Sequence, residues 1–288
     1  MIPAQFDYIA AKSLDEALSL LARHKDDAKL LAGGHSLIPA MKLRLMQPSV
    51  LIDISRIKDL SYIREEGGQL RIGAMTTHYQ VESSDLLHRV CPLLPETATH
   101  LGDVQVRNRG TIGGSLVHAD PAADWPAAIL ALDAELVVKG PKGERVIQSA
   151  DFFVDLLTTA LQPGEILREI RIAAPKGKFG QAYVKFRHPA SGFAVAGIAV
   201  SLVKDGAGKC QSSGIGITGI APKAYRAKGV ESALKGSAFD DKSLHAAASH
   251  AADGVEANAD LFASAEYRKH LAVIYTRRAI EEAASRIR

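Results

Sequence analysis

Two short glycine-rich segments constrain this sequence more than any other feature. The first, AGGHS at residues 32–36, follows a strand-like run and precedes the helix-like stretch LIPAMKLRL. The second, TIGGS at residues 111–115, also lies directly before an apolar run. Glycine leaves the backbone accessible, and amides at a strand-to-helix turn point outward with the helix dipole behind them. Both segments are therefore candidate anion-binding loops.

A simple turn is the competing interpretation of each segment taken alone, because the chain contains 24 glycines. No GxGxxG motif enters a predicted helix, and no GxxxxGK[ST] motif is present. The two commonest phosphate-binding loops are thus missing. Two diglycines with similar flanking residues favour another kind of loop that also binds an anion through backbone amides.

Composition limits the classes of protein to consider. The chain has 288 residues, of which 47% are hydrophobic and 23% charged, so about two globular domains are expected. A net charge of +3 with interspersed signs does not favour nucleic-acid binding. The N-terminus resembles no signal peptide and no apolar run could span a bilayer, which predicts a cytoplasmic protein. Cys91 and Cys210 are too few for an iron–sulfur cluster or a structural zinc site, and we expect buried, reduced thiols.

Hydrophobic periodicity predicts the elements of the N-terminal part. The run from Ser13 to Glu16 has the pattern of a capping box, and the helix it opens has apolar positions at 14, 17, 18 and 21. We further predict strands at 6–10, 28–31, 50–54 and 166–172, hairpins at 62–72 and 135–148, and a helix at 127–132.

The stretch AAPKGK at residues 173–178 predicts a domain boundary, with domains at 1–177 and 178–288. Strands are expected beyond it at 180–187, 193–203 and 211–220, followed by helices at 243–252 and from 265 to the C-terminus. The last helix presents Tyr267, Leu271, Ile274 and Tyr275 on one predicted core face. This segregation of sheets and helices is typical of the α+β class and disfavours a doubly wound nucleotide fold.

Three strings together carry a family resemblance: AGGHSLIPAMKLR, IGAMTTH at residues 72–78, and GTIGGSLVHADPAAD. They resemble the FAD-binding medium subunit of the molybdenum hydroxylases, the xanthine dehydrogenase and carbon monoxide dehydrogenase family. The resemblance extends from Met1 to the C-terminal helix. It implies a PCMH-type FAD-binding domain of two α/β subdomains, divided near residue 55, followed by a C-terminal antiparallel sheet with helices.

The resemblance also implies which residues contact FAD. The first loop would bind the pyrophosphate, and the second would approach the diphosphate and flavin from the other side. Asp124, and less directly Asp120, would accept hydrogen bonds from FAD hydroxyls, and Lys185 would place a positive charge near the isoalloxazine. No residue is expected to be catalytic or to bind a metal. The implied FAD-binding residues are Ala32, Gly33, Gly34, His35, Ser36, Leu37, Thr76, Gly110, Thr111, Ile112, Gly113, Gly114, Ser115, Asp120, Asp124 and Lys185.

Two positions depart from the family pattern. Many relatives carry asparagine where Ser115 stands, so this contact has a shorter reach. An acidic residue and then an aromatic or aliphatic residue often follow the KFRHPAS string, whereas this chain has Gly192 and Phe193. A tyrosine contact to the flavin is therefore not implied, and Phe193 could either shield the ring or belong to a core strand.

The implied function is electron transfer. Substrate would be hydroxylated at a molybdopterin centre on a large subunit, and electrons would cross two [2Fe–2S] clusters on a small subunit to non-covalently bound FAD. The terminal acceptor could be a quinone, NAD, oxygen or another carrier. The expected assembly is a dimer of heterotrimers, that is, a heterohexamer. Two alternatives are a stand-alone flavin oxidase with FAD linked through His35, and an assembly scaffold that has lost its flavin.

Overall fold

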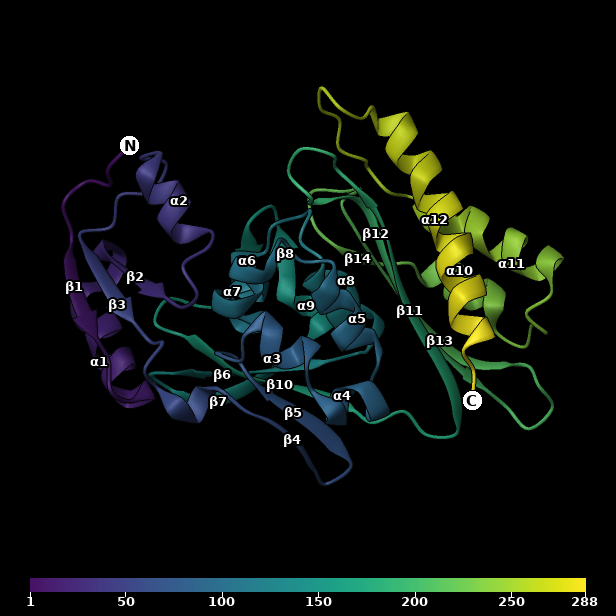
Figure 1. Cartoon of the computed structure of the whole chain (residues 1–288), viewed down its shortest axis with the longest axis horizontal. Coiled ribbons are helices and arrows are strands. Elements are labelled where there is room, and N and C mark those ends of the chain that lie inside the picture. The colour runs from purple at the N-terminus through teal and green to yellow at the C-terminus, as the bar shows by residue number, and fades with distance from the viewer.

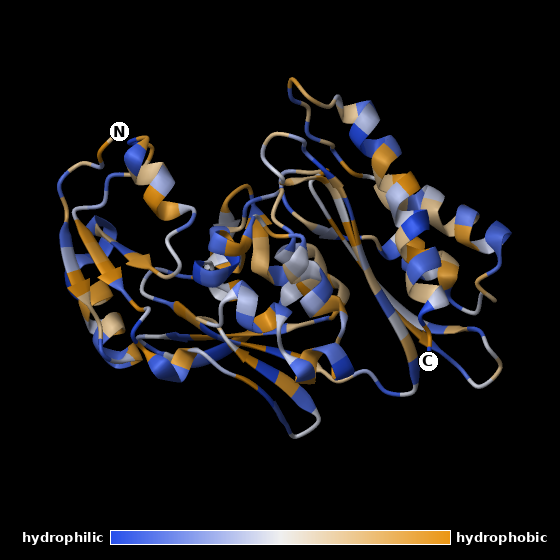
Figure 2. Ribbon diagram, in the orientation of Figure 1, coloured by the Kyte–Doolittle hydropathy of each residue, from blue (hydrophilic) through white to orange (hydrophobic).

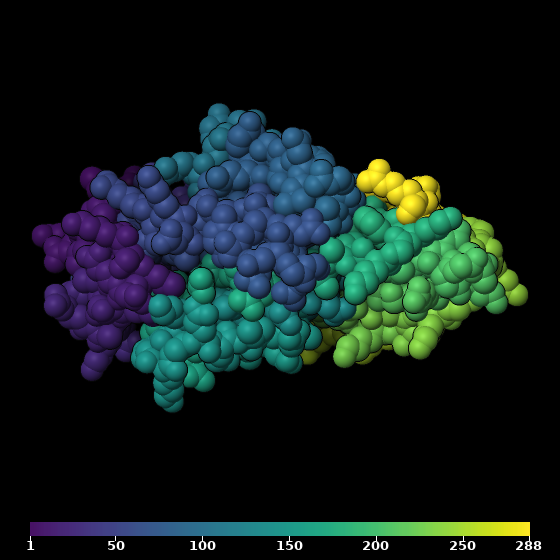
Figure 3. Space-filling model, turned by 90° about the horizontal axis from the view of Figure 1, so that it is seen from below, coloured from purple at the N-terminus to yellow at the C-terminus, as the bar shows by residue number.

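The computed structural model describes residues 1–288, and three parts of the chain follow one another along its long axis. Figure 1 shows the three parts from left to right, and the space-filling view in Figure 3 shows the same order from below. The first part contains β1 (Asp7–Ala10), α1 (Leu14–His24), η1 (Lys25–Asp27), β2 (Ala28–Leu31), α2 (Leu37–Lys42) and β3 (Val50–Asp53). Its strands form a parallel sheet in the order β1-β3-β2. The predicted elements are confirmed, and the parallel pairing is new.

The central strand of this sheet is fully enclosed. All four residues of β3 are buried, as expected for a strand with a neighbour on each side and a helix against the sheet. Figure 2 shows the strands of this lobe with hydrophobic segments. The first diglycine follows the end of β2, so this sheet fixes the position of the first loop.

The start of α1 differs in one detail from the predicted capping box. The Ser13 side chain accepts a hydrogen bond from the Glu16 amide, as predicted. The Glu16 carboxylate, however, accepts from the amide of Lys12 at 2.7 Å instead of that of Ser13. Only half of the reciprocal box forms, because the carboxylate reaches one residue further back.

The second part is built on a five-stranded antiparallel sheet in the order β4-β5-β10-β6-β7. Both predicted hairpins are present, and β10 joins them by pairing with β5 on one side and β6 on the other. Its elements are η2 (Lys58–Leu60), β4 (Ile63–Glu66), β5 (Gln69–Gly73), α3 (His78–Glu82), α4 (Asp85–Val90), α5 (Leu93–Thr99), α6 (Val104–Arg109), α7 (Ile112–His118), α8 (Trp125–Ala131), β6 (Glu135–Gly140), β7 (Gly143–Gln148), α9 (Ser149–Phe152), β8 (Phe153–Asp155), β9 (Thr158–Thr159) and β10 (Ile166–Ala173).

The third part is an antiparallel sheet in the order β11-β12-β13-β14 with helices on its outer face. Helices α5 and α8 of the second part pack on one face of this sheet, and α12 packs on the other (Figure 1). No helix combines the length and hydropathy needed to cross a bilayer. The elements are β11 (Lys178–Arg187), β12 (Ala194–Lys204), β13 (Cys210–Thr218), β14 (Tyr225–Arg226), α10 (Lys228–Leu234), α11 (Asp241–Ala248), η3 (Ser249–Ala252) and α12 (Ala265–Ser285).

The buried face of α12 agrees only in part with the sequence prediction: Leu271 is buried and Tyr275 packs at the edge of the core, but Tyr267 lies outside it. The fully enclosed positions of α12 are mostly small, with Ala272, Thr276 and Ala279 near the middle of the helix. Tyr267 is 42% exposed, and its ring meets only the edge of Phe186. Small side chains let the helix lie close to the sheet, whereas the large aromatic residues fit at the margin of this contact.

Two glycines on β13 allow α8 to lie directly against the sheet. A Cβ atom on Gly214 would lie 1.9 Å from the carbonyl oxygen of Ala131, and one on Gly216 would lie 2.0 Å from that of Ala127. Real Cβ atoms do not approach backbone oxygens this closely, so any side chain at either position would push the helix away. These glycines join the second and third parts of the molecule.

We expect Gly216→Ala to lower the free energy of unfolding by about 3 kcal/mol, because the added methyl group meets backbone that cannot rotate aside. Chemical denaturation of the two proteins would measure the difference. Gly206→Ala is the matched control, since a Cβ there meets nothing within 4 Å. Equal unfolding midpoints for both variants would contradict the close contact of α8 with β13.

Candidate functional site

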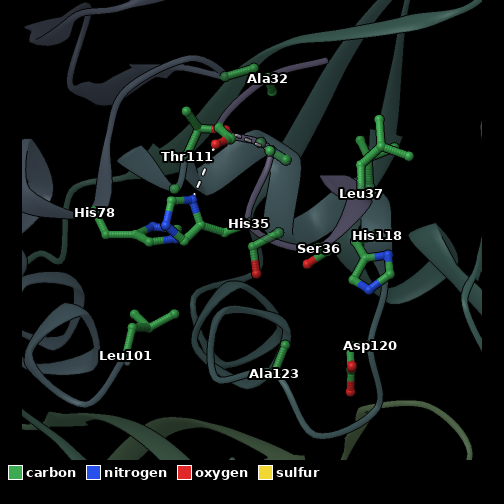
Figure 4. Close-up of a pocket in the computed structure, with 18 of the residues that line it drawn as sticks. Ala32, His35, Ser36, Leu37, His78, Leu101, Thr111, His118, Asp120 and Ala123 are labelled. Atoms are coloured by element: carbon green, nitrogen blue, oxygen red, sulfur yellow. Dashed lines mark hydrogen bonds between the residues drawn. The ribbon is translucent and has the colours of Figure 1, made fainter. Parts of the chain in front are cut away.

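A cavity of about 540 Å³ opens between the three parts of the chain. The two glycine loops line it, and β11, the loop before β12 and the segment after β9 complete its wall. Figure 4 shows His35 and Ser36 of the first loop across the cavity from Leu101 and Ala123. Residues far apart in sequence therefore meet around one space.

The first loop presents a row of free backbone donors. The amides of residues 33–37 donate no hydrogen bond within the chain. The next amide, that of Ile38, is satisfied by the carbonyl of Gly34 at 3.0 Å and so begins the regular bonding of α2. Consecutive unpaired amides at the start of a helix form a concave positive surface that suits a phosphate or another anion.

The two glycines of the first loop are each required for a different structural reason. Gly34 has φ +78°, in the left-handed region that favours residues without a side chain. Gly33 faces the second loop, where a Cβ would lie 2.3 Å from the carbonyl oxygen of Arg109 and 2.7 Å from the Cα of Gly110. The two loops thus touch through their backbones, and the cavity wall is continuous across them.

The second loop is organised differently, because its amides are mostly used by the protein itself. Thr111 is the N-cap of α7, and its hydroxyl accepts from the Gly114 amide at 3.1 Å. The amides of Ile112 and Gly113 donate to carbonyls of Thr76 and Ala74. The second loop therefore supplies shape and side chains, whereas the first supplies amide donors.

Most of the residues predicted from the sequence line this cavity. Thr76 and Ile112 do not: both side chains are fully buried, and the Thr76 hydroxyl bonds to the backbone of Tyr62 at 3.0 and 3.2 Å. These two residues support the loops from behind, and their predicted contact with FAD stays a prediction. The lining residues from the predicted set are Ala32, Gly33, Gly34, His35, Ser36, Leu37, Gly110, Thr111, Gly113, Gly114, Ser115, Asp120, Asp124 and Lys185.

A buried ion pair lies in the cavity wall. The Lys185 ammonium is 2.9 Å from the carboxylate of Asp124, and the two side chains are 1% and 5% exposed. The Tyr183 hydroxyl donates to the same carboxylate at 2.5 Å. Each carboxylate oxygen of Asp124 therefore accepts one hydrogen bond from the protein, and its predicted contact with ligand hydroxyls stays a prediction.

Burial opposes both charges of this pair. It raises the pKa of Asp124, while Lys185 and the Tyr183 hydroxyl act in the opposite direction. It lowers the pKa of Lys185, while Asp124 acts in the opposite direction. Burial and the adjacent carboxylate also raise the pKa of Tyr183 well above its ordinary value. The tyrosine is thus a neutral hydrogen-bond donor, and the ion pair depends on mutual contact.

A second buried contact connects the loop region to α8. The Trp125 indole donates to Nδ1 of His78 at 3.0 Å, and the ring centroids are 5.8 Å apart. Because Nδ1 accepts this bond, it carries no proton. Burial, with contributions from His35 and Arg107, lowers the pKa of His78 to about 4. His78 is therefore a neutral structural acceptor in the cavity wall.

Several residues that line the cavity were missing from the sequence prediction. His78 also lines the cavity, as do Leu157, Leu161 and Leu167, which form an apolar stretch of its wall. Phe193 is 47% exposed and lines the cavity before β12 begins, so it is not a core strand residue. The string TTH in IGAMTTH could have indicated that His78 lines the cavity. Nothing in the local sequence distinguished the three leucines from ordinary core residues.

The arrangement can bind an anion beside an apolar ring. The amide row could hold the negative group, the leucines and Phe193 offer apolar contact, and Lys185 supplies one buried positive charge.

Residues 4–175 match the FAD-binding domain of molybdopterin dehydrogenases, and residues 181–283 match the CO dehydrogenase flavoprotein C-terminal domain.

Whole-chain relatives show the same relationship. The carbon monoxide dehydrogenase medium chain of Hydrogenophaga pseudoflava is 43% identical over 286 residues, which are 99% of each chain. The 6-hydroxypseudooxynicotine dehydrogenase complex subunit alpha of Paenarthrobacter nicotinovorans is 36% identical and covers 100% of this chain and 97% of that one. A solved structure of Hydrogenophaga pseudoflava carbon monoxide dehydrogenase, lacking the Mo-pyranopterin moiety of its cofactor, matches 100% of both chains with a TM-score of 0.97 at 44% identity.

We expect stability to fall as the pH drops from about 6.5 towards 4. The folded chain holds His78 with a pKa near 4, below its ordinary 6.5, so it binds fewer protons than the unfolded chain between these values. The lowered pKa of His78 contributes at most about 3 kcal/mol to the free energy of unfolding, and this contribution is complete above pH 6.5. Burial and Lys185 also lower the pKa of His100 to about 4, which acts in the same direction.

The variant His78→Asn isolates this contribution, because the amide oxygen can replace Nδ1 as acceptor for Trp125 and does not titrate. Denaturation at a series of pH values should show a shallower acid slope for this variant, with part of the slope remaining. The exposed His245→Asn is the control and should keep the parent slope. An unchanged slope in the His78 variant would contradict the assignment.

Proposed function

The chain belongs to the FAD-binding medium subunits of the molybdenum hydroxylases, and on this premise we propose that it binds FAD non-covalently and relays electrons through it. Its relatives are oxidoreductase subunits, and the chain is one as well. The row of free amides at residues 33–37 is the observation that supports the proposal most directly. A diphosphate is an anion of the kind that such amides bind.

The cavity residues fit FAD by their chemistry. The amide row and the Ser36 hydroxyl would hold the diphosphate, and the apolar wall around Leu167 and Phe193 would face the ring system. The volume of about 540 Å³ lies within the usual range for cofactor pockets. Ala32, Leu37, Gly114 and Ser115 would shape the space between the two loops.

The chemistry comes from the cofactor, because bound FAD accepts and releases electrons and protons at its ring. The residues of this chain bind it, exclude water from the ring and set the local charge. Lys185 would place its ammonium near the isoalloxazine, as the family resemblance implies. No side chain is required as an acid, a base or a nucleophile towards the organic substrate.

We propose partner subunits for the remaining steps. A small subunit with two [2Fe–2S] clusters would donate electrons, and a large molybdopterin subunit would hydroxylate the substrate, in a cytoplasmic dimer of heterotrimers. Relatives named as medium chains and as a complex subunit support a multi-subunit assembly. Cys91 and Cys210 are buried and unpaired, which agrees with a reducing compartment.

The change of sheet near residue 177 supports a division of labour between domains 1–177 and 178–288. Strand β10 ends at Ala173 and β11 begins at Lys178, so the connection lies between two different sheets. We propose that the first domain holds the diphosphate, through subdomains that divide near residue 55. The second would complete the ring end of the cavity through Lys185 and Phe193.

The stand-alone oxidase with FAD linked through His35 is not favoured. Residues 181–283 match a flavoprotein C-terminal domain and not a substrate domain, and the relatives share this length. Nδ1 of His35 lies 3.1 Å from the carbonyl oxygen of Gly33, so the imidazole has a hydrogen-bond partner within its own loop. The intact amide row also speaks against a scaffold without flavin.

Affinity purification of the tagged chain from its native host tests the whole proposal. We expect FAD, iron and molybdenum to co-purify, because the flavin must lie near a cluster that partner subunits carry. Acid precipitation should then release the flavin into the supernatant. A chain that purifies alone and reduces its own flavin with an organic substrate would disprove the relay, and colour retained in the washed pellet would indicate a covalent bond.

The variant Ser36→Ala tests the diphosphate site. The Ser36 hydroxyl is exposed and makes no hydrogen bond within the chain, so its loss should leave stability unchanged. We expect FAD affinity to fall about tenfold or more, as for the loss of a hydrogen bond to a charged group. Flavin titration of the apoprotein measures the dissociation constant. Ser212→Ala, on exposed β13 surface, is the control, and equal affinity in both variants would place the diphosphate elsewhere.

A further inference from the structure

Three elements, β11, α5 and α8, come together around the Lys185 ammonium. Tyr183 and Lys185 are two residues apart on β11, so their side chains leave the strand on the same face. Asp124 stands directly before α8, and His100 directly follows α5. Lys185 donates to Asp124 at 2.9 Å and to the carbonyl oxygen of His100 at 3.1 Å. The charge is therefore held by groups from three separate segments.

A glycine on the neighbouring strand leaves room for the Tyr183 hydroxyl. Gly197 pairs with Lys185 across the β11 and β12 strands, and a Cβ on Gly197 would lie 2.4 Å from this hydroxyl. The ring itself is enclosed, with the edge of His100 at a centroid distance of 5.3 Å. A Cβ at Gly197 would also lie 2.8 Å from Cγ2 of Thr218, so this glycine serves both neighbours. A phenylalanine at position 183 would fill the same core, so packing alone does not explain the hydroxyl.

The hydroxyl has one partner, and that partner is the counterion of Lys185. It donates to Asp124 at 2.5 Å and so shares the carboxylate with the ammonium. Lys185 has three N–H donors, of which Asp124 and the His100 carbonyl use two, and one remains for a ligand in the cavity that Lys185 lines. The position of the free donor thus depends on how Asp124 is held.

From this arrangement we infer that Tyr183 is a positioning residue, whose hydroxyl holds Asp124 so that the Lys185 ammonium faces FAD and raises its reduction potential. The inference rests on the proposed function, which places the flavin ring beside Lys185. A buried ammonium favours the more negative, reduced form of a nearby ring, because charge is weakly screened in a site without water. Tyr183 acts only through Asp124 and Lys185.

The direction of the effect follows from the hydrogen bonds. Without the hydroxyl, Asp124 loses a donor that neutralises part of its charge. The carboxylate then either draws the ammonium closer to itself or takes a proton from it. Both responses make the field at the cavity wall less positive, so the reduced ring is less stabilised.

The variant Tyr183→Phe tests the inference in the intact complex as purified. At a fixed potential set by a redox dye, we expect the ratio of reduced to oxidised FAD to fall about tenfold, which is a shift of about 30 mV for a two-electron couple. FAD content should stay at the parent level. Tyr225→Phe is the matched control, because Tyr225 is also a largely enclosed tyrosine with one hydrogen bond, to the Ala251 carbonyl at 2.9 Å.

The outcomes separate this inference from the proposed function. A parent protein without FAD would refute the function itself, whereas flavin-loaded Tyr183→Phe with an unchanged potential would refute only the role of Tyr183. Equal shifts in both tyrosine variants would also refute it. If Tyr183→Phe fails to fold, Gly197→Ala displaces the hydroxyl without removing it, and the same loss of reduced FAD is expected.

Discussion

The close contact between α8 and β13 is the constraint on which the cavity depends. Backbone carbonyls of α8 lie where side chains of Gly214 and Gly216 would otherwise stand. This fixes the helix relative to the third sheet, and with it the two residues at its start. Asp124 then lies over Lys185, and Trp125 reaches His78 beside the loops. Helix α8 therefore fixes the positions of the charge pair, the glycine loops and the C-terminal sheet relative to one another.

Glycine serves two different purposes in the loops, and the structure separates them. Gly33, Gly110 and Gly113 are crowded by the protein: their Cβ positions fall against Arg109, His78 and Ala74. These glycines let the loops and their support pack together. The donors for an anion come instead from the amides of residues 33–37, which packing leaves free. The diglycine motifs thus mainly allow close packing of the backbone. The resulting loop conformation leaves the amides of residues 33–37 unpaired.

The sequence predicted the elements well because their signals are local. Strand alternation, turn glycines and the order of hairpins located the sheets, and the string similarity predicted the family and most cavity residues. The errors arose where a partner comes from elsewhere in the chain. Nothing near Tyr183 indicates that its hydroxyl reaches Asp124, and nothing in α12 indicates that small residues must face the sheet. The partner of the Thr76 hydroxyl, the backbone carbonyl of Tyr62, likewise comes from another segment.

The row of unpaired amides also links cofactor supply to the abundance of folded protein. Without a ligand these donors must be hydrated, so the loop contributes little to the stability of the empty chain. A ligand that binds only the folded state adds stability in proportion to the logarithm of its concentration, about 2.7 kcal/mol at one hundred times its dissociation constant. An anion bound at this loop would therefore make the loaded chain more stable than the empty one.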